Sequence, residues 1–112
     1  MQKRRNILDR IPVRDREFVT EDGKVVVLVP RFDGPLGRWV TRRLSRPHYR
    51  VRLDSMGTAV WNACDGTRTV GQIVQELRHR HGTEVEPAEQ RVVTFVRRLE
   101  RGRCIRFAER GT

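Results

Sequence analysis

A short turn in the second half of the chain separates two amphipathic segments and restricts how both can fold. Apolar residues recur with helical spacing on each side, so each segment is expected to be a helix that buries one face. These residues are Met56, Ala59, Val60 and Ala63 before the turn, and Val70, Ile73, Val74 and Leu77 after it. Within the turn, residues 65–70, Gly66 suits the positive φ at which helices often end. Thr69 followed by Gln72 predicts a capping box for the second helix.

The rest of the chain contains signals for strands and for one more helix. Asp22-Gly23 between two β-prone runs is a strong hairpin signal. Residues 49–53 alternate strictly between apolar residues and arginine, so one face of this third strand should meet the core. The expected strands are residues 18–20, 25–29, 49–53 and 104–107, and the last helix should begin at Pro87 and end at Gly102.

These elements predict a single α+β domain of the winged helix-turn-helix-like type, with N-terminal antiparallel β-strands followed by a three-helix bundle. We expect the domain to comprise residues 13–112. Residues 1–12 are expected to form a flexible N-terminal tail unless Ile7, Leu8 and Ile11 dock on the domain.

The net charge of +10 is concentrated in two blocks, residues 31–52 and 91–112, whereas the helices around the turn are mildly acidic. A partner attracted by charge should therefore meet the segment before these helices or the helix after them. The predominance of Arg over Lys suits bidentate binding of carboxylate or phosphate, although biased base composition would produce it equally well. Residues 31–48 form a basic insertion, in which a short helix could cover the core with Trp39 or face a partner or a membrane surface.

Motifs for catalysis and for metal binding are missing from the sequence. Cys64 and Cys104 are far apart without a CxxC motif, so both are predicted to be small buried apolar residues and neither a metal site nor a disulfide is expected. The residues assemble no catalytic constellation and no phosphate-binding glycine loop. The chain is therefore predicted to be no enzyme and to use no cofactor. The apolar runs are too short for a membrane span or a secretory signal, which predicts a cytoplasmic location.

Two binding functions from different classes remain. In the first, the last helix enters the major groove of DNA, with Arg91, Thr94, Arg98 and Arg101 as its contacts. In the second, an extended peptide adds to the exposed edge of the third strand and lies against the last helix. A third interpretation is a structural partner of a larger enzyme, which would be contacted through residues 35–46.

Roughly half of the chain, from residue 51 to residue 107, carries a family resemblance. The residues that match are Leu53, Ala59-Val60-Trp61, residues 64–70, Ile73-Val74, Leu77, Val92, Phe95-Val96, Leu99, Gly102 and Ile105. In this pattern the chain resembles the family of coenzyme PQQ synthesis protein D and the related precursor-peptide recognition elements of ribosomal peptide natural-product pathways. The basic insertion is longer than the link that the family usually has there.

The resemblance implies a non-catalytic adaptor that binds the leader of a ribosomally made precursor peptide by strand addition. It would present that leader to a modifying enzyme, which is a radical SAM protein in the PQQ case. Carried over by position, the peptide-binding residues are Tyr49, Arg50, Val51, Arg52, Leu53, Arg91, Thr94, Phe95 and Arg98. Arg91 stands where the family pattern usually has Asp, so an acidic peptide is expected. Formation of a homodimer and binding of nucleic acid stay open.

Overall fold

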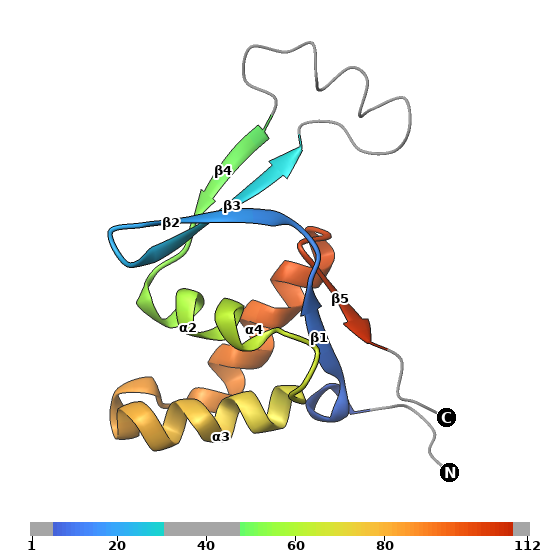
Figure 1. Ribbon diagram of the computed structural model, residues 1–112. Coiled ribbons are helices and arrows are strands. Elements are labelled where there is room, and N and C mark those ends of the chain that lie inside the picture. Colours follow the sequence, from blue (N-terminus) through green and yellow to red (C-terminus); the bar gives the residue numbers. More distant parts are fainter. Residues whose placement is uncertain (1–5, 31–47, 109–112) are drawn as a thin grey trace.

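The computed structural model describes residues 6–30 and 48–108 of the chain. These residues form two small antiparallel sheets and three α-helices, which confirms the predicted α+β class with its antiparallel strands and three helices (Figure 1). The likeness to a winged helix-turn-helix stays a prediction. The short helix expected in the basic insertion lies outside the described residues.

The larger sheet has the strand order β2-β3-β4, with all neighbours antiparallel. Its strands are β2 (Glu17–Glu21), β3 (Lys24–Pro30) and β4 (His48–Arg52). At the β2–β3 turn, Asp22 and Gly23 have φ values of 54° and 78°, both positive as a two-residue turn of the primed type requires. The predicted hairpin is therefore confirmed.

The smaller sheet joins the two ends of the described chain. Strand β1 (Ile11–Arg14) pairs with β5 (Ile105–Ala108), and Ile11 lies opposite Ala108. A 3-10 helix, η1 (Ile7–Asp9), precedes β1, and Ile7 and Leu8 pack against the core. Of the two states considered for this segment, the structure thus shows residues 7–12 docked, and β1 is a strand that the sequence pattern did not predict.

The helices are α2 (Ser55–Ala63), α3 (Val70–His81) and α4 (Ala88–Arg101), with a 3-10 helix, η2 (Gly82–Val85), after α3. The carboxylate of Asp54 caps α2 by accepting a hydrogen bond of 2.7 Å from the Gly57 N–H. The predicted capping box of Thr69 and Gln72 is present at the start of α3. Pro87 is the N-cap of α4 and not its first helical residue, because the Glu86 carboxylate binds the Ala88 N–H at 3.0 Å and the helix begins there.

A single apolar core lies between the helices and the larger sheet. Trp61 is its largest fully buried side chain, and its ring packs edge-on against Phe18 with 5.6 Å between the ring centroids. The other large contributions are Val25 and Val27 from β3, Val60 from α2, Ile73 and Val74 from α3, and Val92 and Val96 from α4. The face predicted for α3 is therefore confirmed. On α2 the buried face is turned from the predicted one: Met56 and Ala59 are only half-buried, and Trp61, which the spacing left out, is fully buried.

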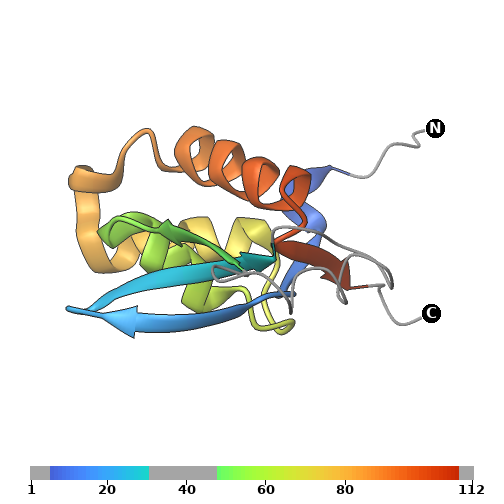
Figure 2. The same cartoon turned by 90° about the horizontal axis from the view of Figure 1, so that it is seen from above.

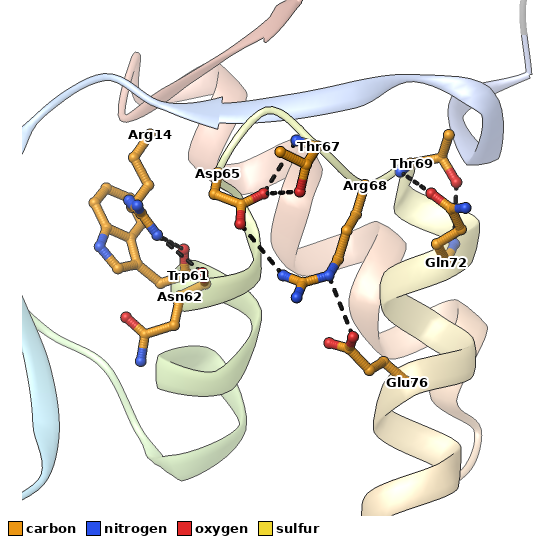
Figure 3. Close-up of polar contacts among 9 residues, drawn as sticks. All are labelled: Arg14, Trp61, Asn62, Asp65, Thr67, Arg68, Thr69, Gln72 and Glu76. Carbon is orange, nitrogen blue, oxygen red and sulfur yellow. Dashed lines mark hydrogen bonds and ion pairs between the residues drawn. The ribbon is translucent and has the colours of Figure 1, made fainter.

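The turn between α2 and α3 is held by its own side chains. Gly66 has a φ of +84°, as predicted. One carboxylate oxygen of Asp65 accepts hydrogen bonds from the Thr67 N–H at 3.0 Å and from the Thr67 hydroxyl at 2.6 Å. Figure 3 shows the Arg68 guanidinium between Asp65 and Glu76, with N–O distances of 3.5 Å and 3.2 Å. The two ion pairs of Arg68 thus connect residues 65–70 to the second helical turn of α3.

Strand β1 holds the same turn from outside. Two backbone hydrogen bonds from β1 join Arg14 N to Cys64 O and Gly66 N to Pro12 O, and a third, from the residue before the strand, joins Val70 N to Arg10 O. The Arg14 side chain also donates to the carbonyl oxygens of Trp61 and Asn62 at 3.2 Å and 2.9 Å, at the end of α2 (Figure 3). The Trp61 carbonyl also accepts from the Cys64 N–H at 3.1 Å.

We expect the domain to lose stability as the pH falls through the range in which carboxyl groups titrate. The hydroxyl of Thr67 lowers the pKa of Asp65 below its ordinary value of 3.8, and the Arg78 guanidinium lowers the pKa of Glu86 below 4.5. Between the lowered and the ordinary values the unfolded chain binds more protons than the folded one, so stability falls toward acid. Urea midpoints at pH 7 and at about pH 3.5 measure this loss.

Variants test whether these two carboxylates contribute to the acid sensitivity. Asp65→Asn and Glu86→Gln should each reduce the difference between the two midpoints. Glu100→Gln is the matched control, because the Glu100 side chain is exposed and makes no hydrogen bond or ion pair within the described ranges. Equal acid sensitivity in all three variants would contradict the assignment.

Candidate functional site

A groove of about 1010 Å³ lies between strand β4 and helix α4. Figure 2 shows α4 running alongside the larger sheet, with β4 as the strand at the sheet's edge. The apolar residues that line the groove are Val29, Val51, Leu53, Met56, Phe95 and Leu99. Its polar lining includes Tyr49 and Arg52 on β4 and Arg91, Thr94 and Arg98 on α4. The groove therefore combines an apolar lining with a basic rim.

Of the residues predicted to bind a peptide, all but Arg50 line this groove. They come from two parts of the chain, residues 49–53 and residues 91–98, which the fold brings to opposite walls. Arg50 lies on the same strand but is not part of the lining. Peptide binding by any of these residues stays a prediction.

Strand β4 lies at the edge of the larger sheet as the described residues form it. The Leu53 N–H donates to the Val25 carbonyl at 2.9 Å, which fixes the odd-numbered residues of this stretch as those that bond to β3. The backbone N–H and C=O groups of Arg50 and Arg52 therefore point away from β3. Within the described part of the chain no other strand pairs with this edge. It can accept the backbone of an added strand.

The side chains of Arg50 and Arg52 lie on the face of the sheet opposite to Val51 and Leu53, because successive side chains of a strand alternate between its faces. Both guanidinium groups bind the Glu21 carboxylate of β2; the Arg52–Glu21 N–O distance is 3.5 Å. The hydrogen bond from Arg50 lowers the pKa of Glu21. Arg50 and Arg52 are thus paired within the sheet, although Arg52 also reaches the lip of the groove.

The opposite wall carries the basic groups that face the groove. Arg91, Thr94 and Arg98 are exposed and lie about one helical turn apart on α4. Arg91 donates to the Glu84 carbonyl at 3.3 Å. Arg98 makes no ion pair or hydrogen bond through its side chain in the described ranges, so its guanidinium is available to a ligand. Arg101, which the DNA-binding alternative needs, is not part of the lining.

Gly57 belongs to the groove, and sequence reasoning did not single it out. A Cβ at this position would lie 3.0 Å from Phe95 Cζ and 3.0 Å from the Asp54 carboxylate. The glycine therefore lets the Phe95 ring pack closely against the first turn of α2. The signal in the sequence was a glycine shortly after a helix cap, but only the tertiary fold places Phe95 opposite it.

The structure also locates the residues considered for other chemistry. Cys64 and Cys104 are both free and buried, which confirms the prediction of small buried residues, and burial raises the pKa of the Cys64 thiol to about 12. Among the described residues, no group of three or more His, Cys, Asp and Glu side chains is arranged to hold a metal ion. No helix in the described ranges has the length and apolar character to cross a bilayer.

Comparison with known proteins adds one match. The family model described as coenzyme PQQ synthesis protein D (PqqD) matches residues 39–105, which are 67 of the 112 residues and so more than half of the chain. The matched segment includes both walls of the groove, β4 and α4. No curated protein and no solved structure matches this chain.

Proposed function

Since this chain belongs to the coenzyme PQQ synthesis protein D family, we propose that it is a non-catalytic cytoplasmic adaptor for a ribosomally made precursor peptide. Its groove would bind the leader of that peptide by strand addition and present it to a modifying enzyme of the radical SAM type. The observation that carries the proposal is the edge of β4, with which no described strand pairs, beside an apolar groove.

Strand addition uses the two kinds of group that the groove offers. The backbone groups of Arg50 and Arg52 would pair with the backbone of the peptide, which gives affinity independent of sequence. Every second side chain of the peptide would then point into the groove, where Val51, Leu53 and Phe95 offer apolar contacts. Such contacts would select the side chains of the leader.

Charge at the rim would favour an acidic leader. Arg98 is available, and Arg91 is bound only through a backbone carbonyl within the described residues. Opposite charges across an interface speed association and exclude wrong partners more than they add affinity. Salt should therefore slow the association of the leader with this groove.

An amide titration tests the proposed site. Adding the leader of a precursor peptide encoded beside this gene should shift the backbone amide resonances of residues 49–53 and of α4. Shifts confined to other elements would overturn the proposal. A DNA duplex titrated in parallel tests the alternative, which requires binding that falls steeply with salt and is lost in Arg98→Gln and Arg101→Gln. A dimer that shields β4 without peptide would assign the edge to self-association.

We expect Arg50→Pro to weaken leader binding about tenfold relative to Arg50→Gln, because proline removes an edge N–H that the added strand needs. Both variants lose the Arg50 guanidinium, so their comparison isolates the backbone donor. This N–H points away from β3, and the larger sheet should keep its stability in Arg50→Pro. Isothermal titration calorimetry measures the affinities, and equal affinities in the two variants would contradict strand addition at this edge.

A further inference from the structure

We propose that the outer face of the larger sheet, formed by Glu21, Arg50 and Arg52, is a second surface that selects the bound peptide. On it the two arginines favour acidic side chains, and Glu21 competes with the peptide for them. The inference rests on the proposed strand addition to β4 and extends it to the face of the sheet that lies away from the groove.

The alternation of side chains in an added strand produces this second surface. Peptide residues opposite Tyr49, Val51 and Leu53 point into the groove, on the same side as those side chains. The residues between them lie opposite Arg50 and Arg52 and point to the outer face, whichever direction the peptide runs. Side chains that are directly opposite on neighbouring strands lie about 5 Å apart at Cβ, which brings a peptide carboxylate within reach of either guanidinium.

The charges on the outer face leave room for a second carboxylate. Two guanidinium groups share the single carboxylate of Glu21, so the cluster keeps one positive charge. The side chains are 53% exposed for Arg50, 59% for Arg52 and 39% for Glu21, so a ligand can reach all three. Arg52 is held by Glu21 only at 3.5 Å, and a guanidinium has five N–H donors. An acidic peptide side chain can therefore bind without first breaking the Arg50–Glu21 pair.

The neighbour of Arg52 on β3 favours a position of the Arg52 side chain close to the sheet surface. In the register of the sheet, Val26 lies between Val19 and Arg52, and it is fully buried although it belongs to the outer face. The register therefore puts the aliphatic part of Arg52 in a position to cover Val26 while its charged end stays in water. Burial of Val26 thus favours a position of the Arg52 side chain across the sheet surface near β4, with or without a bound peptide.

The ligand class that satisfies both faces is an extended segment in which apolar and acidic residues alternate. Apolar side chains would enter the groove and acidic ones would meet Arg50 and Arg52. Short synthetic peptides of about six residues, the usual length of a strand, provide the probes. One alternates Val with Glu and the other alternates Val with Gln, so they differ only in charge on the outer face.

The experiment measures the binding of both peptides to the full chain and to charge variants by fluorescence anisotropy. Against the Val-Glu peptide, the double variant Arg50→Gln/Arg52→Gln should bind roughly two- to fivefold more weakly, and Glu21→Gln roughly two- to fivefold more tightly. Binding of the Val-Gln peptide should change little in either. Arg97→Gln/Arg101→Gln and Glu100→Gln are the matched controls, because they change the net charge by −2 and +1, as the test variants do, at exposed positions of α4 outside the groove lining.

The outcomes separate this inference from the proposed function. If the peptides shift the amides of β4 and α4 but the Glu21 and arginine variants bind both peptides as the controls do, the second surface is wrong and strand addition stands. If neither the leader nor these peptides shift β4, strand addition itself is wrong. Thermal melts of each variant show whether a loss of binding reflects loss of fold, and an affinity gain in Glu21→Gln cannot arise from unfolding.

Discussion

Replacing Trp61 with Ala is expected to lower the free energy of unfolding by about 3–5 kcal/mol, because a large buried ring is removed and the surrounding core closes only in part. Trp61 is fully buried in the core and contacts Phe18 edge-on. A domain of this kind has a total stability of about 5–15 kcal/mol, so the variant should be close to unfolding. Urea denaturation followed by far-ultraviolet circular dichroism measures the loss without relying on tryptophan fluorescence.

Trp61→Phe is the matched control for this variant. The buried Trp61 Nε1–H has no hydrogen-bond partner among the described residues, so phenylalanine removes an unsatisfied donor and loses no hydrogen bond. It keeps an aromatic ring in the core, and the loss should be about 1–2 kcal/mol. An equal loss in Trp61→Phe and Trp61→Ala would show that the indole ring acts through a contact other than packing.

Gly66→Val is expected to lower the free energy of unfolding by about 2–4 kcal/mol, mainly through backbone strain. Gly66 has a φ of +84°, a conformation that a β-branched residue rarely adopts. A Cβ there would also lie 3.4 Å from Val13 Cγ2 on β1. Gly66→Asn is the control, because asparagine tolerates positive φ and its urea midpoint should stay closer to that of the native chain.

The same variant tests where the peptide site lies. The turn at residues 65–70 is not part of the groove lining, so Gly66→Val should lose peptide binding only to the extent that it unfolds. Binding measured at low temperature, where the folded fraction is largest, should approach that of the native chain. A variant that stays folded and yet loses the leader would move the site to this turn.

The elements that sequence reasoning predicted well are those with local signals. The Asp22-Gly23 turn, the capping box of Thr69 and Gln72, and the positive φ of Gly66 each depend on residues close together in the chain. Their physics is largely independent of the rest of the fold. Strand β1 has no comparable signal, because its partner β5 lies at the other end of the chain and Pro12 interrupts its pattern.

The candidate site was predictable only in part for the same reason. Alternation placed the side chains of Arg50 and Arg52 away from the core, but only the fold shows that Glu21 of β2 pairs with both. The contact between Gly57 and Phe95 joins α2 to α4, and the spacing of residues along the sequence does not predict it. The family resemblance predicted which two segments form the walls of the groove. The pairing of charges across the sheet could be seen only in the three-dimensional structure.

The pairing of β1 with β5 gives the chain a late step in its assembly. The β2–β3 hairpin and the α2–α3 pair consist of neighbours in sequence and can form as soon as they leave the ribosome, whereas β1 must wait for residues 105–108. Until then β1 has its hydrogen bonds to the turn after α2 but no partner in its sheet. Shortening the chain by its last strand would therefore remove the sheet partner of the first one, and that first strand contacts a turn forty residues away from the cut, since residue 65 is 40 positions before residue 105.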